Sequence, residues 1–146
     1  RLHDVLPRLK ALGGTFNPPA ALEQLARLET FLGTRLPYDV WTFYRSANGM
    51  PDFECDTHMV SFWSIERILS DPDSVLGSTG PSQVAFADGM LNAWFFRYVP
   101  SSTGLSVVSE LDPTHWRWSS LEQFLEAYLA APQEISLVDR LERTEP

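Results

Sequence analysis

Residues Leu22 to Gly49 read LEQLARLETFLGTRLPYDVWTFYRSANG, and this stretch decides the fold. Four leucines recur every three or four residues and therefore share one face of a helix: Leu22, Leu25, Leu28 and Leu32. Gly33 follows the last leucine and can adopt the left-handed conformation that ends a helix. The spacing predicts an amphipathic helix that ends at this glycine.

A second helix is predicted directly after the first. Pro37 suits the first turn of a helix, where its missing N–H costs nothing, and Asp39 lies near the positive end of the helix dipole. The apolar face of this helix is rich in aromatic side chains: Val40, Trp41, Phe43, Tyr44 and Ala47. Asn48-Gly49 is a strong stop signal. The stretch therefore predicts two helices joined by a short turn.

The same pattern resembles the SUKH superfamily, whose members include fungal cell-wall-synthesis regulators and many bacterial toxin-immunity proteins. The matching pieces, in order, are Glu29, Leu32-Gly33, Leu36-Pro37-Tyr38-Asp39, Phe43-Tyr44 and Asn48-Gly49. The resemblance covers about residues 20–131. It implies an α+β fold, no catalytic activity and a function in protein binding.

The residues on either side of this stretch predict shorter elements. A first helix is expected over residues 4–12, with Asp4 as its cap. A strand is expected over 58–63 and a short helix over 64–69 with Ser64 as its cap. Residues 70–83 are turn-formers throughout and predict an exposed loop.

The later part of the chain alternates strand and turn signals. Residues 83–87 and 91–99 are rich in β-formers, and Asp88-Gly89 between them suits a tight hairpin turn. Within 91–99 neither face is cleanly polar, so we expect both faces to be partly covered. A further strand is expected over 105–111. Ser119 with Glu122 forms a capping-box pattern before a closing helix, and residues 135–141 are expected to add a turn or a helix.

These elements indicate a single α+β domain over residues 1–146. Helices grouped before and after a run of strands favour an antiparallel sheet of about four to six strands, packed with N-terminal helices and a C-terminal helix. The length suits one domain, and no run of apolar residues is long enough to span a membrane. The single cysteine, Cys55, excludes an internal disulfide and fits a cytoplasmic protein.

The net charge of −8 is concentrated in the middle of the chain. Residues 46–96 carry seven acidic side chains but only one basic side chain, Arg67. Nucleic acids and anionic membranes select basic surfaces, so we expect neither as a partner. An acidic segment instead permits a basic protein partner.

The sequence contains no recognisable catalytic or ligand-binding motif, so we expect no catalytic residues, no cofactor and no metal. Cys55 and His58 lie three residues apart, which is too little to assign a cysteine enzyme. The metal-ligand supply, one cysteine and three histidines, is scattered along the chain, so Cys55 and His58 make at most half of a zinc site. Neither a phosphate-binding loop nor a dinucleotide fingerprint occurs.

The candidate partner-binding residues lie in and beside the acidic segment. Asp52, Glu54 and Asp56 alternate and, if extended, share one face. The full set comprises these three with Glu66, Asp71, Asp73, Trp63 and Trp94. Two alternatives stay open for the acids, a solvated loop or a contact surface, and each tryptophan belongs either to the core or to an interface.

From the resemblance and the charge asymmetry we expect an immunity protein. It would bind and neutralise a cognate toxin, often a nuclease or another basic domain, by steric occlusion. The alternative is a regulatory scaffold domain of the cell-wall-regulator kind, without a toxin partner. The sequence leaves the oligomeric state open.

Overall fold

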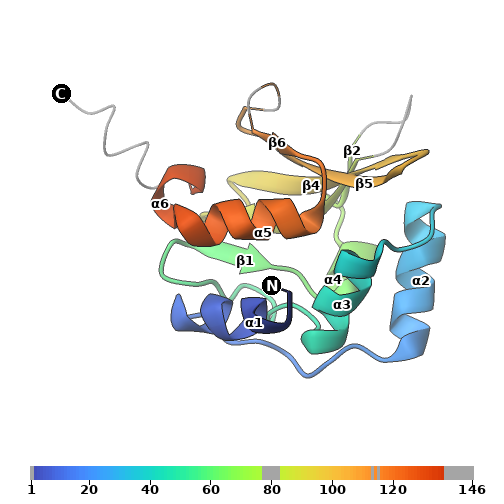
Figure 1. The fold of residues 1–146 in the computed structure, drawn as a ribbon, viewed down its shortest axis with the longest axis horizontal. Coiled ribbons are helices and arrows are strands. Elements are labelled where there is room, and N and C mark those ends of the chain that lie inside the picture. The colour runs from blue at the N-terminus through green and yellow to red at the C-terminus, as the bar shows by residue number, and fades with distance from the viewer. Residues whose placement is uncertain (1, 77–82, 113, 115, 137–146) are drawn as a thin grey trace.

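A computed structural model describes residues 2–76, 83–112, 114 and 116–136 (Figure 1). Six helices are present in these ranges: α1 Leu2–Ala11, α2 Leu22–Leu32, α3 Tyr38–Ser46, α4 Ile65–Ser70, α5 Leu121–Ala130 and α6 Pro132–Ile135. The strands are β1 Val60–Phe62, β2 Val75–Leu76, β3 Gln83–Gly89, β4 Trp94–Ser101, β5 Gly104–Ser109 and β6 Arg117–Trp118.

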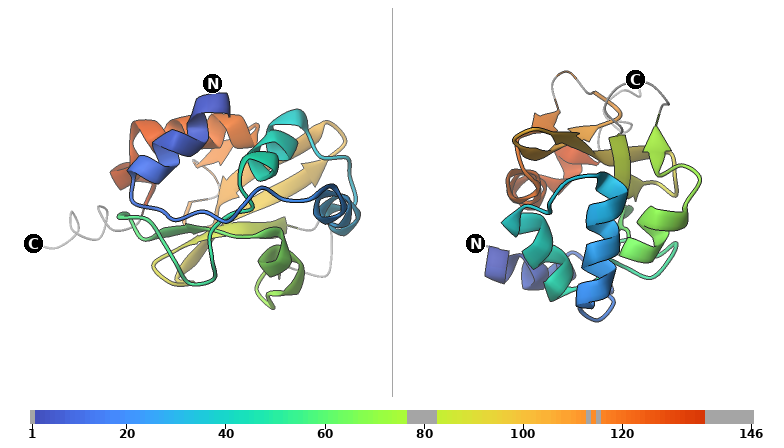
Figure 2. Two further views of the ribbon diagram at one scale, coloured as in Figure 1. Left: turned by 90° about the horizontal axis from the view of Figure 1, so that it is seen from below. Right: turned by 90° about the vertical axis from the view of Figure 1, so that its right-hand side faces the viewer.

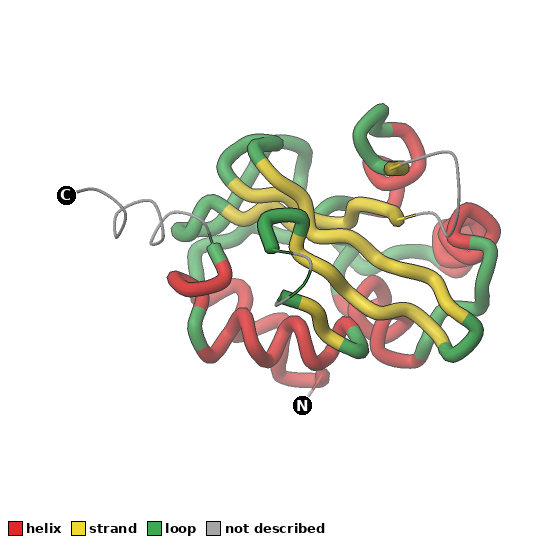
Figure 3. The backbone as a smooth tube through the Cα atoms, turned by 90° about the horizontal axis from the view of Figure 1, so that it is seen from above, coloured by secondary structure: helices red, strands yellow, loops and turns green. Residues whose placement is uncertain are grey.

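The strands form one six-stranded antiparallel sheet in the order β1-β3-β4-β5-β6, with β2 also paired to β3 (Figure 3). Helices α1, α3 and α5 contact one another and cover one side of the sheet. Figure 2 shows α4 on the opposite side, with α2 standing at the end of the sheet and packed against α4. The predicted α+β class with an antiparallel sheet and flanking helices is confirmed.

The two helices of the opening stretch form as their caps predict. Gly33 ends α2 with φ 72° and donates its N–H to the carbonyls of Glu29 and Thr30. Pro37 precedes α3, which ends at Ser46, before the predicted Asn48-Gly49 stop. The carboxylate of Asp39 accepts the backbone N–H of Glu122 at 2.9 Å, so α3 also caps the start of α5.

The main core lies between the sheet and the three helices. Phe96 and Tyr98 of β4 point to this side, where Phe96 packs 5.0 Å from Phe124 of α5 and Tyr98 stacks on Phe86 at 4.1 Å. The hydroxyls of Tyr44 and Tyr98 form a buried hydrogen bond of 2.8 Å that joins α3 to the sheet. Phe95 of β4 points to the other side, so both faces of the strand are covered, as expected.

The predicted hairpin turn at Asp88-Gly89 is wrong. Strand β3 continues through Gly89, and the turn falls on residues 90–93. A Cβ on Gly89 would lie 2.1 Å from the Trp94 ring, so this glycine serves close packing rather than a turn. Asp88 is held in the strand because its carboxylate accepts hydrogen bonds from Trp63 and from the Asn92 backbone.

Several predicted boundaries also shift. Helix α1 begins at Leu2 rather than at Asp4, and β5 ends at Ser109 rather than at Leu111. The cap of α5 is Ser120, whose hydroxyl accepts the N–H of Gln123, and not Ser119. The expected loop 70–83 contains β2, while residues 77–82 and 137–141 lie outside the described ranges. Ser64 caps α4 as predicted.

Candidate functional site

The side of the sheet that carries α4 is built around the guanidinium of Arg67, which is only 6% exposed. It lies 4.0 Å over the Trp63 ring, and its Nε donates to Asp71 at 3.2 Å. Its NH2 group donates to Asn92 at 2.8 Å and lies 3.8 Å from the Asp88 carboxylate. The one basic side chain of residues 46–96 is therefore buried and neutralised.

Neither predicted aromatic contact residue lies on the surface, because Trp63 and Trp94 are each 1% exposed. The indole N–H of Trp63 donates to Asp88 at 2.6 Å, and its ring packs edge-on against Phe95 at 5.9 Å. Trp94 packs over Gly89 on the opposite side of the sheet. Both are core residues, so this conformation does not present them to a partner.

The three alternating acids do not share one face. Asp52 and Glu54 are exposed, whereas Asp56 is 5% exposed and turned inward. Its carboxylate accepts the backbone N–H groups of His58 and Val60 at 2.8 and 3.1 Å, and the hydroxyl of Tyr128. The segment is a series of turns instead of the extended chain that alternation requires, with φ values of 66° at Phe53 and 62° at Met59.

The side chains in the segments around Arg67 form what we call the acidic surface, and all of them are exposed except Asp71, whose side chain is 15% exposed. It comprises five carboxylates and two apolar side chains: Asp52, Phe53, Glu54, Glu66, Asp71, Asp73 and Leu91. Phe53 is 69% exposed with its ring 5.3 Å from the Arg67 guanidinium, and Leu91 is 60% exposed beside Asn92. Sequence reasoning found the acids but missed both apolar residues, which no periodic pattern marks.

The turn that displays Leu91 is held in an unusual conformation. Met90, Leu91 and Asn92 have φ values of 49°, 56° and 69°, in the left-handed region that non-glycine residues rarely adopt in succession. Two buried residues hold the turn in place. The Asp88 carboxylate accepts the Asn92 N–H at 2.7 Å, and Arg67 donates to the Asn92 side chain. The buried ion network therefore orders the exposed turn.

Glu66 lies at the edge of the acidic surface nearest α2. Burial alone raises the pKa of this carboxyl, but the hydrogen bonds from its own backbone N–H, Asn48 and Gln24 and the charge of Arg27 outweigh it. The net result is a pKa below the usual value of 4.5. The Asn48 side chain also accepts the Ile65 N–H at 2.9 Å, so the chain just beyond the end of α3 fixes the start of α4.

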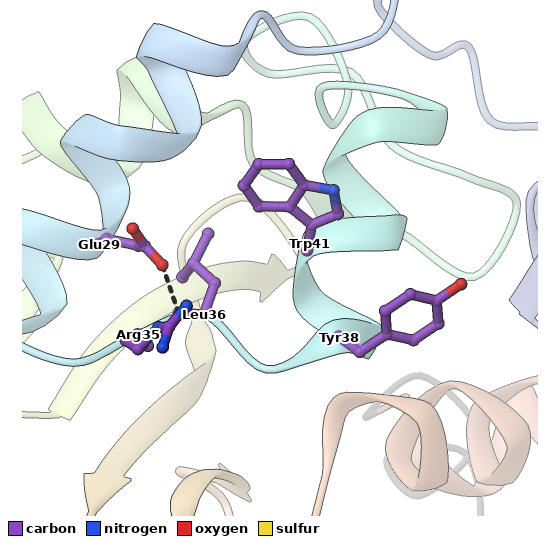
Figure 4. Close-up of a pocket in the computed structure, with 5 residues that line it drawn as sticks. All are labelled: Glu29, Arg35, Leu36, Tyr38 and Trp41. Carbon is purple, nitrogen blue, oxygen red and sulfur yellow. Dashed lines mark hydrogen bonds between the residues drawn. The ribbon is translucent and has the colours of Figure 1, made fainter.

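A separate pocket of about 490 Å³ lies between the end of α2 and the start of α3 (Figure 4). It is lined by Glu29, Arg35, Leu36, Tyr38 and Trp41. Figure 4 shows Glu29 and Arg35 on one side of the pocket, with Leu36 and the Trp41 ring beside them, while the Tyr38 ring points away from the other four side chains. Trp41, assigned to an apolar helix face from the sequence, is half-buried and forms part of this wall.

The environment of the Cys55 thiol does not favour its use as a nucleophile. Burial, followed by the charges of Asp56 and Asp88, raises the pKa of the Cys55 thiol, whereas reactive cysteines have a lowered pKa. In the described ranges no three side chains of the metal-binding types form a group that could hold an ion. His115 lies outside those ranges. No described helix is long and apolar enough to cross a membrane.

The fold and this surface define the class of protein: an α+β domain with helices on both sides of an antiparallel sheet and an acidic surface over α4. The model of the SMI1 / KNR4 family (SUKH-1) matches residues 19–127, so the chain belongs to this family. The resemblance inferred from the opening helices is thereby confirmed. No curated protein matches the sequence. Family membership fits an immunity or a regulatory domain.

Proposed function

We propose that this domain is a non-enzymatic immunity protein that binds a basic toxin domain through the acidic surface and blocks it sterically. One observation carries the proposal: the acidic segment exposes carboxylates, while its single basic side chain, Arg67, is buried. The family match supports a domain of this kind. A cytoplasmic location follows from the proposal, since the toxin is neutralised where it would act.

The charge distribution suits rapid capture of a basic partner. Asp71 pairs with Arg67, which is buried, so the segment exposes no basic side chain that offsets its carboxylates. Complementary charge chiefly raises the association rate and is weakened by salt. The carboxylates therefore act as a steering element.

Electrostatic steering brings the partner to the surface but adds little binding energy. Phe53 and Leu91 supply apolar contact area for the bound complex. Apolar side chains at the centre of an interface carry much of the binding energy, while a polar rim excludes water. Phe53 lies between Asp52 and Glu54, and Leu91 projects from the turn that Arg67 and Asp88 fix. Because the turn is already ordered in the free protein, it loses less conformational entropy when the complex forms.

The second candidate is a regulatory scaffold domain, which the family match favours equally. It would use the same surface for a partner other than a toxin. Gene neighbourhood separates the two candidates, because an immunity gene is expected beside its toxin gene and a regulator is not.

Two charge-matched variants test the proposal in a capture experiment from the source cells at low and high salt. Asp52→Lys with Glu54→Lys alters the acidic surface. Glu122→Lys with Glu134→Lys makes the same charge change on α5 and α6, on the other side of the sheet, without breaking an ion pair of the described residues. We expect a basic toxin domain to be captured by the native chain at low salt and lost at high salt.

The surface variant should bind that domain at least tenfold more weakly, mainly through a slower association rate, and the α5–α6 variant should bind nearly as the native chain does. Equal losses in the two variants would show that only the net charge matters. Capture of envelope-synthesis proteins in place of a toxin would favour the scaffold function.

A further inference from the structure

We propose that the pocket between α2 and α3 receives an arginine or lysine side chain of the basic partner. The inference rests on the proposed function for the sign of the partner's charge. It adds a second binding site, on the other flank of α2 from the acidic surface (Figure 2).

The aromatic wall of the pocket is open to solvent. Tyr38 and Trp41 both line the pocket from the first turn of α3, with the Trp41 ring turned toward Glu29 and the Tyr38 ring pointing away from it. Tyr38 is 80% exposed, and its hydroxyl and the indole N–H of Trp41 make no hydrogen bond within the described ranges. Exposed aromatic faces attract cations, arginine above all, because the ring face is negative.

The opposite wall supplies a fixed carboxylate. Glu29 is half-buried, and one of its oxygens accepts the backbone N–H of Leu36 at 2.9 Å, which holds the side chain against the link between the helices. Its second oxygen makes no hydrogen bond or ion pair with any described residue. A positioned carboxylate facing the Trp41 ring matches a planar guanidinium, which can stack on the ring and donate hydrogen bonds to the carboxylate at once.

Arg35 is the one feature that opposes a cation. Its side chain is exposed, and no described residue pairs with it. Solvent screens an exposed and unpaired charge, whereas Glu29 is fixed in the wall. The net charge of −8 of the whole chain also favours a cation over an anion. The structure thus gives opposite roles to the two charged residues of the pocket, and this makes the sign of the ligand testable.

The test is an NMR titration of the 15N-labelled domain with three capped tripeptides, in which the residue between two glycines is arginine, norleucine or glutamate. The reporters are the indole N–H of Trp41 and the backbone N–H of Leu36. We expect the arginine peptide to bind about tenfold more tightly than the norleucine peptide, and the glutamate peptide to bind most weakly.

The variants give the decisive comparison. Glu29→Gln keeps an acceptor for the Leu36 N–H, removes the charge and should weaken arginine binding about threefold to tenfold. Arg35→Gln should leave binding unchanged or tighten it. Tyr38→Ala, at an exposed position that the fold does not need, should also weaken it.

Two outcomes would overturn the proposal. In the first, the glutamate peptide binds best and Arg35→Gln abolishes that binding, which would make the pocket an anion site. In the second, no peptide shifts the two reporters at millimolar concentration. Neither outcome touches the proposed function, which depends on the charge-matched variants of the acidic surface and of α5–α6.

Discussion

Replacement of Gly49 by alanine should destabilise the domain far more than the same change at Gly33. Both glycines have positive φ, 62° and 72°, so alanine is strained at either site. They differ in the space around them. A Cβ on Gly49 would lie 2.3 Å from the Trp63 carbonyl oxygen and 2.6 Å from the Ser64 nitrogen, whereas a Cβ on Gly33 meets nothing within 4 Å. The pair therefore separates backbone strain from steric conflict.

The magnitude follows from what must move. Alanine in the left-handed region costs about 1–2 kcal/mol, and the smaller freedom of the unfolded chain returns about 0.4–1 kcal/mol. Gly33→Ala should therefore lower the free energy of unfolding by about 1 kcal/mol. At Gly49 the colliding atoms are backbone, so relief requires residues 48–50 to separate from 63–65.

That separation breaks two hydrogen bonds, Met50 N–H to Phe62 O at 2.7 Å and Ile65 N–H to the Asn48 side chain at 2.9 Å. Each of the two bonds leaves a buried group unpaired at about 1–3 kcal/mol, so with about 1 kcal/mol of backbone strain Gly49→Ala should lose about 3–7 kcal/mol in total. Urea unfolding followed by tryptophan fluorescence measures both variants. If the two losses of unfolding free energy differ by less than about 1 kcal/mol, the close approach of residues 48–50 to residues 63–65 is not the reason that Gly49 is needed.

Three further predictions follow from the buried hydrogen bonds and the pKa shifts. Tyr44→Phe or Tyr98→Phe should each cost about 1–3 kcal/mol in urea unfolding, because the remaining hydroxyl loses its partner, and the double variant should cost less than the sum of the two. The pKa of Glu66 is lowered on folding, so its contribution is complete above its ordinary pKa of 4.5 and is lost as the pH falls through the lowered value. The stability difference between the native chain and Glu66→Gln, measured by urea unfolding, should therefore vanish in acid; a constant difference would assign it to packing. Burial raises the pKa of Cys55, so iodoacetamide should label the folded chain more slowly than the urea-unfolded chain at the same pH, and equal rates would contradict the assignment.

Local signals in the sequence predicted the structure correctly where the residue has a single structural role that it can play at that position. Gly33 ends α2 in the left-handed conformation, and Ser64 caps α4 through its hydroxyl, as predicted. The turn after β3 was misplaced because Asp88-Gly89 has two physical uses. The dipeptide suits a tight turn, but here the aspartate binds Trp63 and the glycine admits the Trp94 ring. Contacts between distant residues decided between the two.

The candidate site was likewise predicted only in part, because some of its features depend on contacts between distant residues. Sequence charge located the acidic segment but did not separate exposed Asp52 and Glu54 from buried Asp56, whose partner Tyr128 lies 72 positions away. Burial of Trp63 likewise depends on Arg67 and on Phe95 of another strand. Alternation in sequence predicts a shared face only if the chain is extended, and here it turns.

The amino-acid sequence by itself determined the helix pair of residues 22–49, the α+β class, the family and the negative charge of the middle segment. These depend on periodicity, caps and composition, which are local or additive properties of the chain. Only the tertiary structure decided which acids face solvent, that Arg67 is buried, and that the end of α2 and the start of α3 enclose a pocket. Those properties depend on hydrogen bonds and packing between residues far apart in sequence, and the fold alone brings such residues together.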